Sequence, residues 1–158
     1  MRYWFDTEFH EDGRTIDLIS IGIVAEDGRT FHAVSADYDL ARATAWLREN
    51  VLAQLLGQPR VPRQRIRSEL AQFIGDGPHE IWAYFGEYDW IALRQLFGDM
   101  LSWPQAWPLC HLDLEQWRLS LGALELPVQT TPMHHALNDA MWTRDSWQRL
   151  RDLTTRGP

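Results

Sequence analysis

The chain has 158 residues, of which 45% are hydrophobic and 23% are charged. This length and composition fit one globular domain with a real core, and they exclude a disordered or fibrous chain. The single cysteine, Cys110, excludes an intrachain disulfide and any zinc site that needs two thiolates. All 15 basic residues are arginine, which excludes lysine-dependent sites such as Walker-A phosphate loops and Schiff-base enzymes. A net charge of −7 argues against binding nucleic acid by bulk positive charge, although bound cations can reverse the local field.

The N-terminal part of the chain predicts an antiparallel meander. Residues 2–6 are aromatic-rich, residues 16–25 are β-branched and apolar, and residues 29–35 continue the strand pattern. Glu26-Asp27-Gly28 is typical of a hairpin turn between the last two strands. Neither a signal peptide nor a run of ~18 apolar residues is recognisable, so we expect no membrane span and a cytoplasmic setting.

The remainder of the chain alternates helical and strand patterns. We expect helices over residues 39–53, 63–74, 88–98, 113–121 and 135–153, and strands over residues 80–85 and 109–112. The predicted fold class is therefore α/β, with a mixed five-stranded sheet flanked by helices. No stretch has the composition of a linker, so residues 1–155 are expected to form a single domain, and the terminal Arg-Gly-Pro is expected to fray.

The tryptophans and the cysteine are expected to be structural. Five tryptophans lie in predicted helices and strands, where core packing is their ordinary role: Trp46, Trp82, Trp117, Trp142 and Trp147. Cys110 lies in the predicted strand 109–112 and is expected to be buried and inert.

Acidic residues follow the first predicted strand. Residues i and i+2 of a strand share a face, so Asp6 and Glu8 can direct two carboxylates at one point. Carboxylates are preferred ligands of Mg²⁺ and Mn²⁺. Taken alone, the pair also fits two solvated charges at the end of a strand.

Three further residues have the same ambiguity when each is considered alone. Asp89 begins a predicted helix, where an acid is favoured by the helix dipole without any catalytic role. His134 and Asp139 flank the start of the last helix. Because five helical residues turn by about 140°, they share a face only if His134 precedes the helix proper.

The five residues together form an ordered set that resembles the three motifs of the DEDDh class of 3′→5′ exonucleases, which includes oligoribonuclease and ribonuclease T. Asp6 and Glu8 match the first motif, Asp89 the second, and His134 with Asp139 the third. The spacing selects His134 over its neighbour His135. Further matches at residues 6–9, 11–16 and 18–22 resemble a short bacterial subfamily of DEDDh exoribonucleases.

The resemblance implies a ribonuclease-H-like fold, two divalent metal ions (Mg²⁺ or Mn²⁺) and hydrolysis of RNA from its 3′ end. It implies that the two ions are held by Asp6, Glu8, Asp89 and Asp139. In two-metal enzymes the two ions lie ~3.5–4 Å from each other. The resemblance also implies that His134 is the general base. The expected product is a nucleoside 5′-monophosphate. Members of the subfamily are often homodimers, so a homodimer is expected here as well.

Substrate contacts are expected next to the acidic pair and on a basic helix. Thr7 and Phe9 adjoin the carboxylates, and Phe9 can stack on the terminal base or pack in the core. Arg63 and Arg67 are i,i+4 neighbours that can hold backbone phosphates of single-stranded RNA or an RNA 3′ end, or simply form a solvated helix face.

Three alternative functions remain open at this point. A proofreading-type DNA exonuclease would use the same residues, and only a contact to the ribose 2′-hydroxyl would distinguish it. A non-catalytic nucleic-acid-binding module would be expected to lose at least one acid or the histidine. An endonuclease of the ribonuclease H type would release oligonucleotides rather than mononucleotides.

Overall fold

A computed structural model of the chain describes residues 1–155, and the predicted fraying of the terminal Arg-Gly-Pro lies outside them. The strands β1 (Arg2–Glu11), β2 (Ile16–Ala25) and β3 (Thr30–Ser35) pair antiparallel in sequence order, which confirms the predicted meander. At the Asp-Gly turn, Gly28 has φ 90°, a left-handed conformation that glycine adopts without steric cost.

The sheet has six strands rather than the five predicted. Their order is β4-β3-β2-β1-β5-β6, where β4 is Arg60–Val61, β5 is Glu80–Ala83 and β6 is Leu112–Asp113. The additional strand, β4, pairs parallel with β3. It was missed because it has only two residues, between Pro59 and Pro62, which is too short for an alternating pattern. β5 pairs parallel with β1, so the central strand of the site has a neighbour on each edge.

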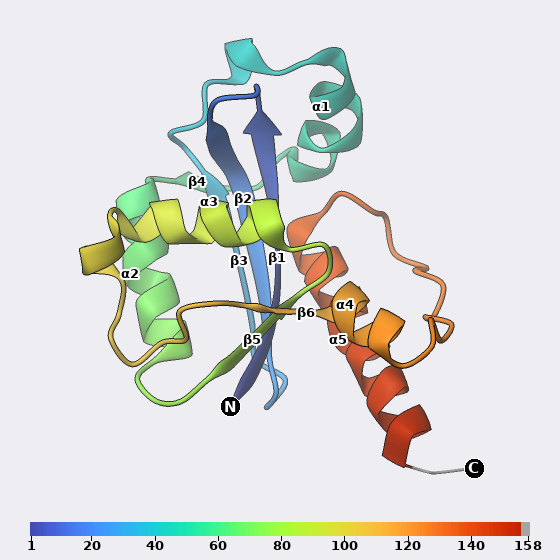
Figure 1. Cartoon of the computed structure of the whole chain (residues 1–158). Helices are drawn as coiled ribbons and strands as arrows, with labels where there is room; N and C mark the ends of the chain where they lie inside the picture. The colour runs from blue at the N-terminus through green and yellow to red at the C-terminus, as the bar shows by residue number, and fades with distance from the viewer. Residues whose placement is uncertain (156–158) are drawn as a thin grey trace.

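Helices cover both faces of this sheet (Figure 1). On one face, α2 (Arg63–Ile74) and α3 (Glu87–Phe97) pack on apolar side chains of the meander, including Tyr3 and Phe5. On the other face, α4 (Leu114–Ser120) and α5 (Ala136–Thr155) enclose Trp4. Alternate residues of β1 therefore face opposite helical layers, as a strand buried on both faces requires.

The predicted helix 39–53 is wrong as a single element. The chain instead forms a 3₁₀ turn at Leu40–Arg42, α1 at Ala45–Asn50 and a second 3₁₀ turn at Leu52–Leu55. Thr44 caps α1 by accepting from the Leu47 amide, which starts a new helix inside the predicted one. The segment packs on Ile19 and Val34 through its own small core.

The predicted strand 109–112 is confirmed as β6 but its bounds are wrong, because the pairing with β5 begins only at Leu112. Cys110 is therefore exposed in the preceding loop rather than buried in a strand. Asp113 does cap α4, where its side chain accepts from the Gln116 amide, as predicted. Trp46, predicted to be in the core, is 52% exposed, because α1 lies at the rim of the fold rather than across the sheet.

Candidate functional site

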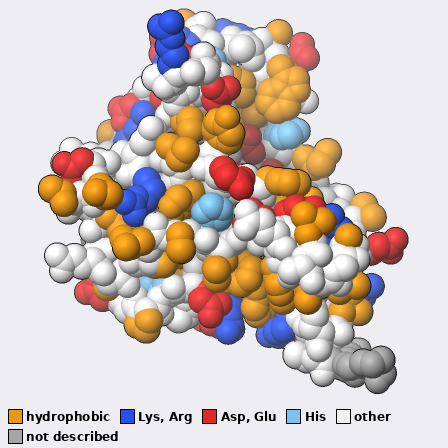
Figure 2. Space-filling model, viewed as in Figure 1, with side chains coloured by type: hydrophobic (Ala, Val, Ile, Leu, Met, Phe, Trp, Pro, Cys, Tyr) orange, Lys and Arg blue, Asp and Glu red, His pale blue; other side chains and the backbone are white. Residues whose placement is uncertain are grey.

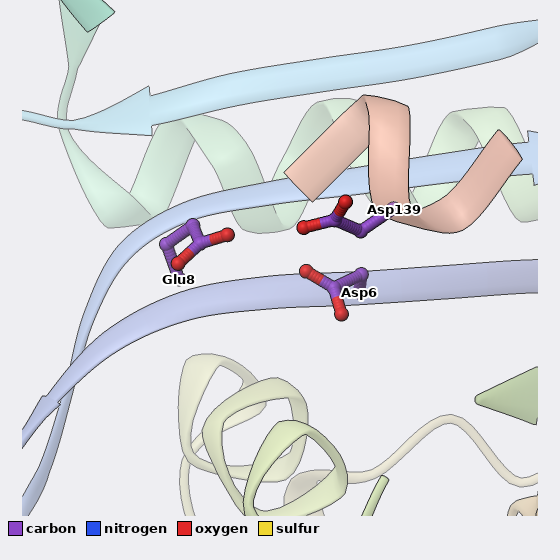
Figure 3. A group of neighbouring side chains, drawn as sticks. All are labelled: Asp6, Glu8 and Asp139. Carbon is purple, nitrogen blue, oxygen red and sulfur yellow. The ribbon is translucent and has the colours of Figure 1, made fainter. Parts of the chain in front are cut away.

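Three carboxylates converge where α5 crosses β1. Asp6 and Glu8 lie inside β1, which extends five residues beyond the predicted strand end, and Asp139 lies in the first turn of α5. Each contributes an oxygen, and these oxygens all lie within 4.8 Å of one another. Figure 3 shows the three side chains directed into one space between the strand and the helix. Such a cluster of oxygen donors suits a hard divalent cation.

Gly22 allows α5 to approach this closely. It pairs with Asp6 across β1 and β2, and the first turn of α5 passes directly over it. A Cβ at position 22 would lie 2.3 Å from the Leu137 backbone nitrogen. A glycine inside a strand indicates such a close approach, so the sequence did carry a signal for this residue.

Asp89 reaches the same cleft from α3. Its Oδ1 accepts from the Thr7 backbone amide at 2.8 Å and from the Thr7 hydroxyl at 2.6 Å. Thr7 faces the α3 layer because it alternates with Asp6 and Glu8 along β1. In this arrangement Thr7 fixes the Asp89 carboxylate relative to the other acids.

The acids destabilise one another's charged forms. Burial, followed by the charges of Asp89, Glu8 and Asp139, raises the pKa of Asp6 well above its usual range. Burial, with the charges of Asp139 and Asp89, raises the pKa of Glu8 to about 8. The pKa of Asp89 rises to about 6, mainly through burial and against the opposing effect of the Thr7 hydrogen bonds. A site of this kind gains stability from cations that neutralise the carboxylates.

His134 lies just before α5, as its pairing with Asp139 requires. Its backbone has a φ of 63°, which is rare for a residue with a side chain. The turn is closed by the His134 amide, which donates to Asp139 Oδ2 at 2.8 Å, and the His135 amide donates to the same oxygen at 3.3 Å. The left-handed turn therefore connects the histidine directly to the carboxylate cluster.

Gln54, in the 3₁₀ turn Leu52–Leu55, and Trp46, in α1, also contact the turn that contains His134. The Gln54 Nε2 donates to the carbonyl oxygens of Met133 and His134, the latter at 3.2 Å. The Trp46 ring meets the His134 imidazole edge-on, with ring centroids 4.9 Å apart. Neither contact was foreseen, because no sequence pattern relates residues 46–54 to residue 134.

These residues enclose a cleft of about 340 Å³, lined by Asp6, Thr7, Glu8, Phe9, Trp46, Asp89, His134 and Asp139. The five predicted catalytic positions thus lie together. Phe9 also lines the cleft, and its ring stacks nearly parallel on Tyr88 with centroids 5.8 Å apart. Tyr88 was not singled out from the sequence.

The two predicted phosphate-binding arginines lie elsewhere. Arg63 is held by Asp17, by the Leu18 carbonyl at 2.7 Å and by the Ser35 hydroxyl. The guanidinium of Arg67 lies over the Phe97 ring, 5.5 Å from its centroid. Figure 2 shows basic side chains on the viewed face as separate groups rather than as one stripe. The structure therefore does not bring this pair to the cleft.

The sequence resembles known proteins along nearly its whole length. Residues 1–150 match the family described as 3′-5′ exoribonuclease Rv2179c-like domain. The chain is 44% identical over 161 aligned residues to the 3′-5′ exoribonuclease Rv2179c of Mycobacterium tuberculosis strain ATCC 25618 / H37Rv. The same identity relates it to the 3′-5′ exoribonuclease MT2234.1 of strain CDC 1551 / Oshkosh. Each alignment covers 98% of this chain and 94% of the relative. Among the described residues, no helix is long and apolar enough to cross a membrane.

Proposed function

Because this chain belongs to the family of Rv2179c-like 3′-5′ exoribonuclease domains, we propose that it hydrolyses single-stranded or 3′-overhanging RNA by the DEDDh mechanism. The product would be a nucleoside 5′-monophosphate. The observation that carries this proposal is the convergence of four acids and His134 on one cleft. These residues lie on an α/β fold with a mixed sheet, which is consistent with a ribonuclease-H-like domain spanning residues 1–155.

The donor set fits divalent cations. The oxygens of Asp6, Glu8 and Asp139 are close enough to share an ion. Without one, burial and the neighbouring carboxylates disfavour the charged forms of Asp6 and Glu8. We assign these three residues, with Asp89, as the ligands of two Mg²⁺ or Mn²⁺ ions. When bound, the ions would lower the pKa of the attacking water and stabilise negative charge on the leaving oxygen.

His134 acts as the general base in this proposal. It accepts a proton from water as the water oxygen bonds to phosphorus and the bond from phosphorus to the leaving 3′ oxygen breaks. Histidine is the side chain that most often serves as a general base in enzymes. The hydrogen bond from its amide to Asp139 and the contact with Trp46 orient the imidazole beside the carboxylates.

Phe9 is assigned to the terminal base. It lines the cleft next to Glu8, and its stacking on Tyr88 holds the ring in a fixed plane. A base stacked on an aromatic ring gains ~1–3 kcal/mol. Phe9→Ala should therefore raise KM more than it lowers kcat, and unchanged kinetics would remove Phe9 from the site.

The proposal is tested with 5′-labelled single-stranded RNA and its DNA counterpart, each incubated with Mg²⁺, Mn²⁺ or EDTA. We expect shortening from the 3′ end with release of mononucleotides, faster on RNA, and abolished by EDTA. His134→Ala should lower kcat by at least ~100-fold, the scale of a lost acid–base group. Asp139→Asn removes a charged ligand of the proposed ions and should lower kcat at least as much. Asp145→Asn, at an exposed position on the same helix, is the matched control and should stay active.

Other outcomes would identify the alternatives. RNA binding without cleavage under any metal would indicate a binding module, and faster cleavage of DNA would indicate a DNA exonuclease. Oligonucleotide products would indicate an endonuclease. We also propose that the protein is cytoplasmic and forms a homodimer. Sedimentation of the purified chain would test the dimer, and fractionation of cells would test the location.

A further inference from the structure

A second hollow opens on the same carboxylates. It has a volume of about 350 Å³ and is lined by Asp6, Tyr84, Gln129, Met133, His134, Asp139, Trp142 and Thr143. Asp6, His134 and Asp139 line both hollows, whereas Glu8, Phe9 and Asp89 line only the first. The two hollows therefore adjoin each other at the proposed reacting centre.

The walls of the second hollow are aromatic and fixed in place. Trp142 lies three residues after Asp139 in α5, so the two side chains occupy the same face of the helix. Its indole Nε1 donates to the Pro127 carbonyl at 2.8 Å, and its ring meets Tyr84 edge-on at 4.9 Å between centroids. An indole anchored at its nitrogen is a preformed surface for a planar ligand.

Residues 127–133 form one border of this hollow and are hydrogen-bonded to the proposed reacting centre. Gln129 donates through Nε2 to Asp139 Oδ1, so residues 127–133 are linked to the carboxylate cluster. Met133, at the rim, is 61% exposed, which leaves the hollow open to solvent on that side. Among the residues that line this hollow, the only carboxylate and imidazole side chains are the three that it shares with the first hollow. This lining suits a neutral, flat, apolar-faced group rather than a phosphate.

We propose that the second hollow binds the base of the penultimate nucleotide, the one whose 3′ oxygen leaves. This inference rests on the proposed function. A scissile phosphodiester over Asp6 and Asp139 has one nucleoside on each side. The first hollow, with Phe9, is assigned to the terminal base, so the second is the place for its neighbour. The base stacks on Trp142, and the open rim at Met133 lets the rest of the strand leave.

The test compares three 5′-labelled tetranucleotides: an intact RNA, one with an abasic penultimate residue, and one with an abasic terminal residue. For the wild type, removal of the penultimate base should lower kcat/KM by about tenfold, the scale of one lost stacking contact. Trp142→Ala should cause a similar loss on the intact substrate, yet no further loss on the substrate that lacks the penultimate base. Its sensitivity to the terminal base should remain that of the wild type.

Two results would overturn the inference. Equal losses on all three substrates would mean that Trp142 is only structural. Loss of sensitivity to the terminal base would place that base, not the penultimate one, in this hollow. If Trp142→Ala does not fold, Met133→Ala at the rim should show the same pattern with a loss of about threefold. Met141→Ala, on α5 itself, is the control. A wild type that cleaves no substrate would refute the proposed function itself.

Discussion

The carboxylates and the histidine of the cleft are positioned by different means. Asp6, Glu8 and Asp89 come from a central strand and a helix, whose backbone places are set by sheet pairing and by the core. His134 lies in an irregular left-handed turn held by a few side-chain contacts, chiefly from Gln54. Mutually repelling charges require the rigid support of the whole fold, whereas the imidazole depends on local hydrogen bonds. Substitutions on the carboxylate side (β1 and α3) should therefore differ in their effects from substitutions on the histidine side (the turn before α5).

The largest combined loss of stability and activity is expected at the backbone contact between β2 and α5. Gly22→Ala places a Cβ against the Leu137 backbone, so α5 must move away from β2. We expect a loss of ~1–3 kcal/mol in unfolding free energy from overpacking. Displacement of Asp139 and His134 should also lower kcat by about 100-fold or more, as misplacement by about 1 Å can do. Urea denaturation and the RNA assay measure the two effects.

Gly28→Ala is the control for that substitution. Gly28 has a positive φ but open space around its Cβ position, and it lies in the β2–β3 turn. It should lose stability through backbone strain and keep its activity. Full activity in Gly22→Ala would contradict the role assigned to the close approach.

Glu8→Gln should separate activity from stability on the carboxylate side. Burial raises the pKa of Glu8 in the folded chain to about 8, whereas its ordinary pKa in an unfolded chain is 4.5. Because the folded state binds the Glu8 proton more tightly, the stability of the metal-free wild type should fall as pH rises between these values. Glutamine resembles the protonated acid, so the variant should be inactive yet more stable than wild type at pH 8.5, with little difference at pH 4.

Urea unfolding in EDTA at both pH values provides this measurement, and Mg²⁺ should stabilise the wild type more than the variant. Glu49→Gln, at an exposed position on α1, is the control and should change the free energy of unfolding by less than ~0.5 kcal/mol. A gain of the same size at both pH values would contradict the raised pKa of Glu8.

A smaller effect is expected on the histidine side. Gln54→Ala removes the donor to the Met133 and His134 carbonyls, which frees the turn without touching the carboxylates. We expect kcat to fall about tenfold, KM to change little, and metal-induced stabilisation to persist. In a His134→Ala background the same change should have no further effect, because the two residues act as one unit. Additive losses would show that Gln54 acts elsewhere, and Gln64→Ala, exposed on α2, is the control.

The smallest effect is expected at a residue outside the cleft. Arg67→Gln removes a charge that lies over Phe97 rather than in the cleft. The change should alter kcat/KM by less than about twofold and leave the salt dependence of RNA binding unchanged, since each phosphate contact contributes to that slope. A flatter slope would restore Arg67 to the substrate path.

Much of the strand framework could be predicted because its residues carry strong local patterns. The β-branched run of β2, the Asp-Gly turn and the aromatic start of β1 indicated an antiparallel meander. The Asp-x-Glu spacing predicted two carboxylates on one face, and they do converge. Local patterns failed for the short strand β4 and for the interrupted segment 39–55, where prolines, caps and packing on β2 and β3 set the structure.

The amino-acid sequence alone determined which residues can carry the chemistry, since residue type and motif order are properties of the chain. Tertiary structure decided how those residues are held. Gly22, Gln54 and Trp46 reach the site from segments distant in sequence, through a backbone contact, two hydrogen bonds and an aromatic edge. No local pattern encodes these contacts, because each exists only after sheet pairing and the packing of α5 bring the segments together.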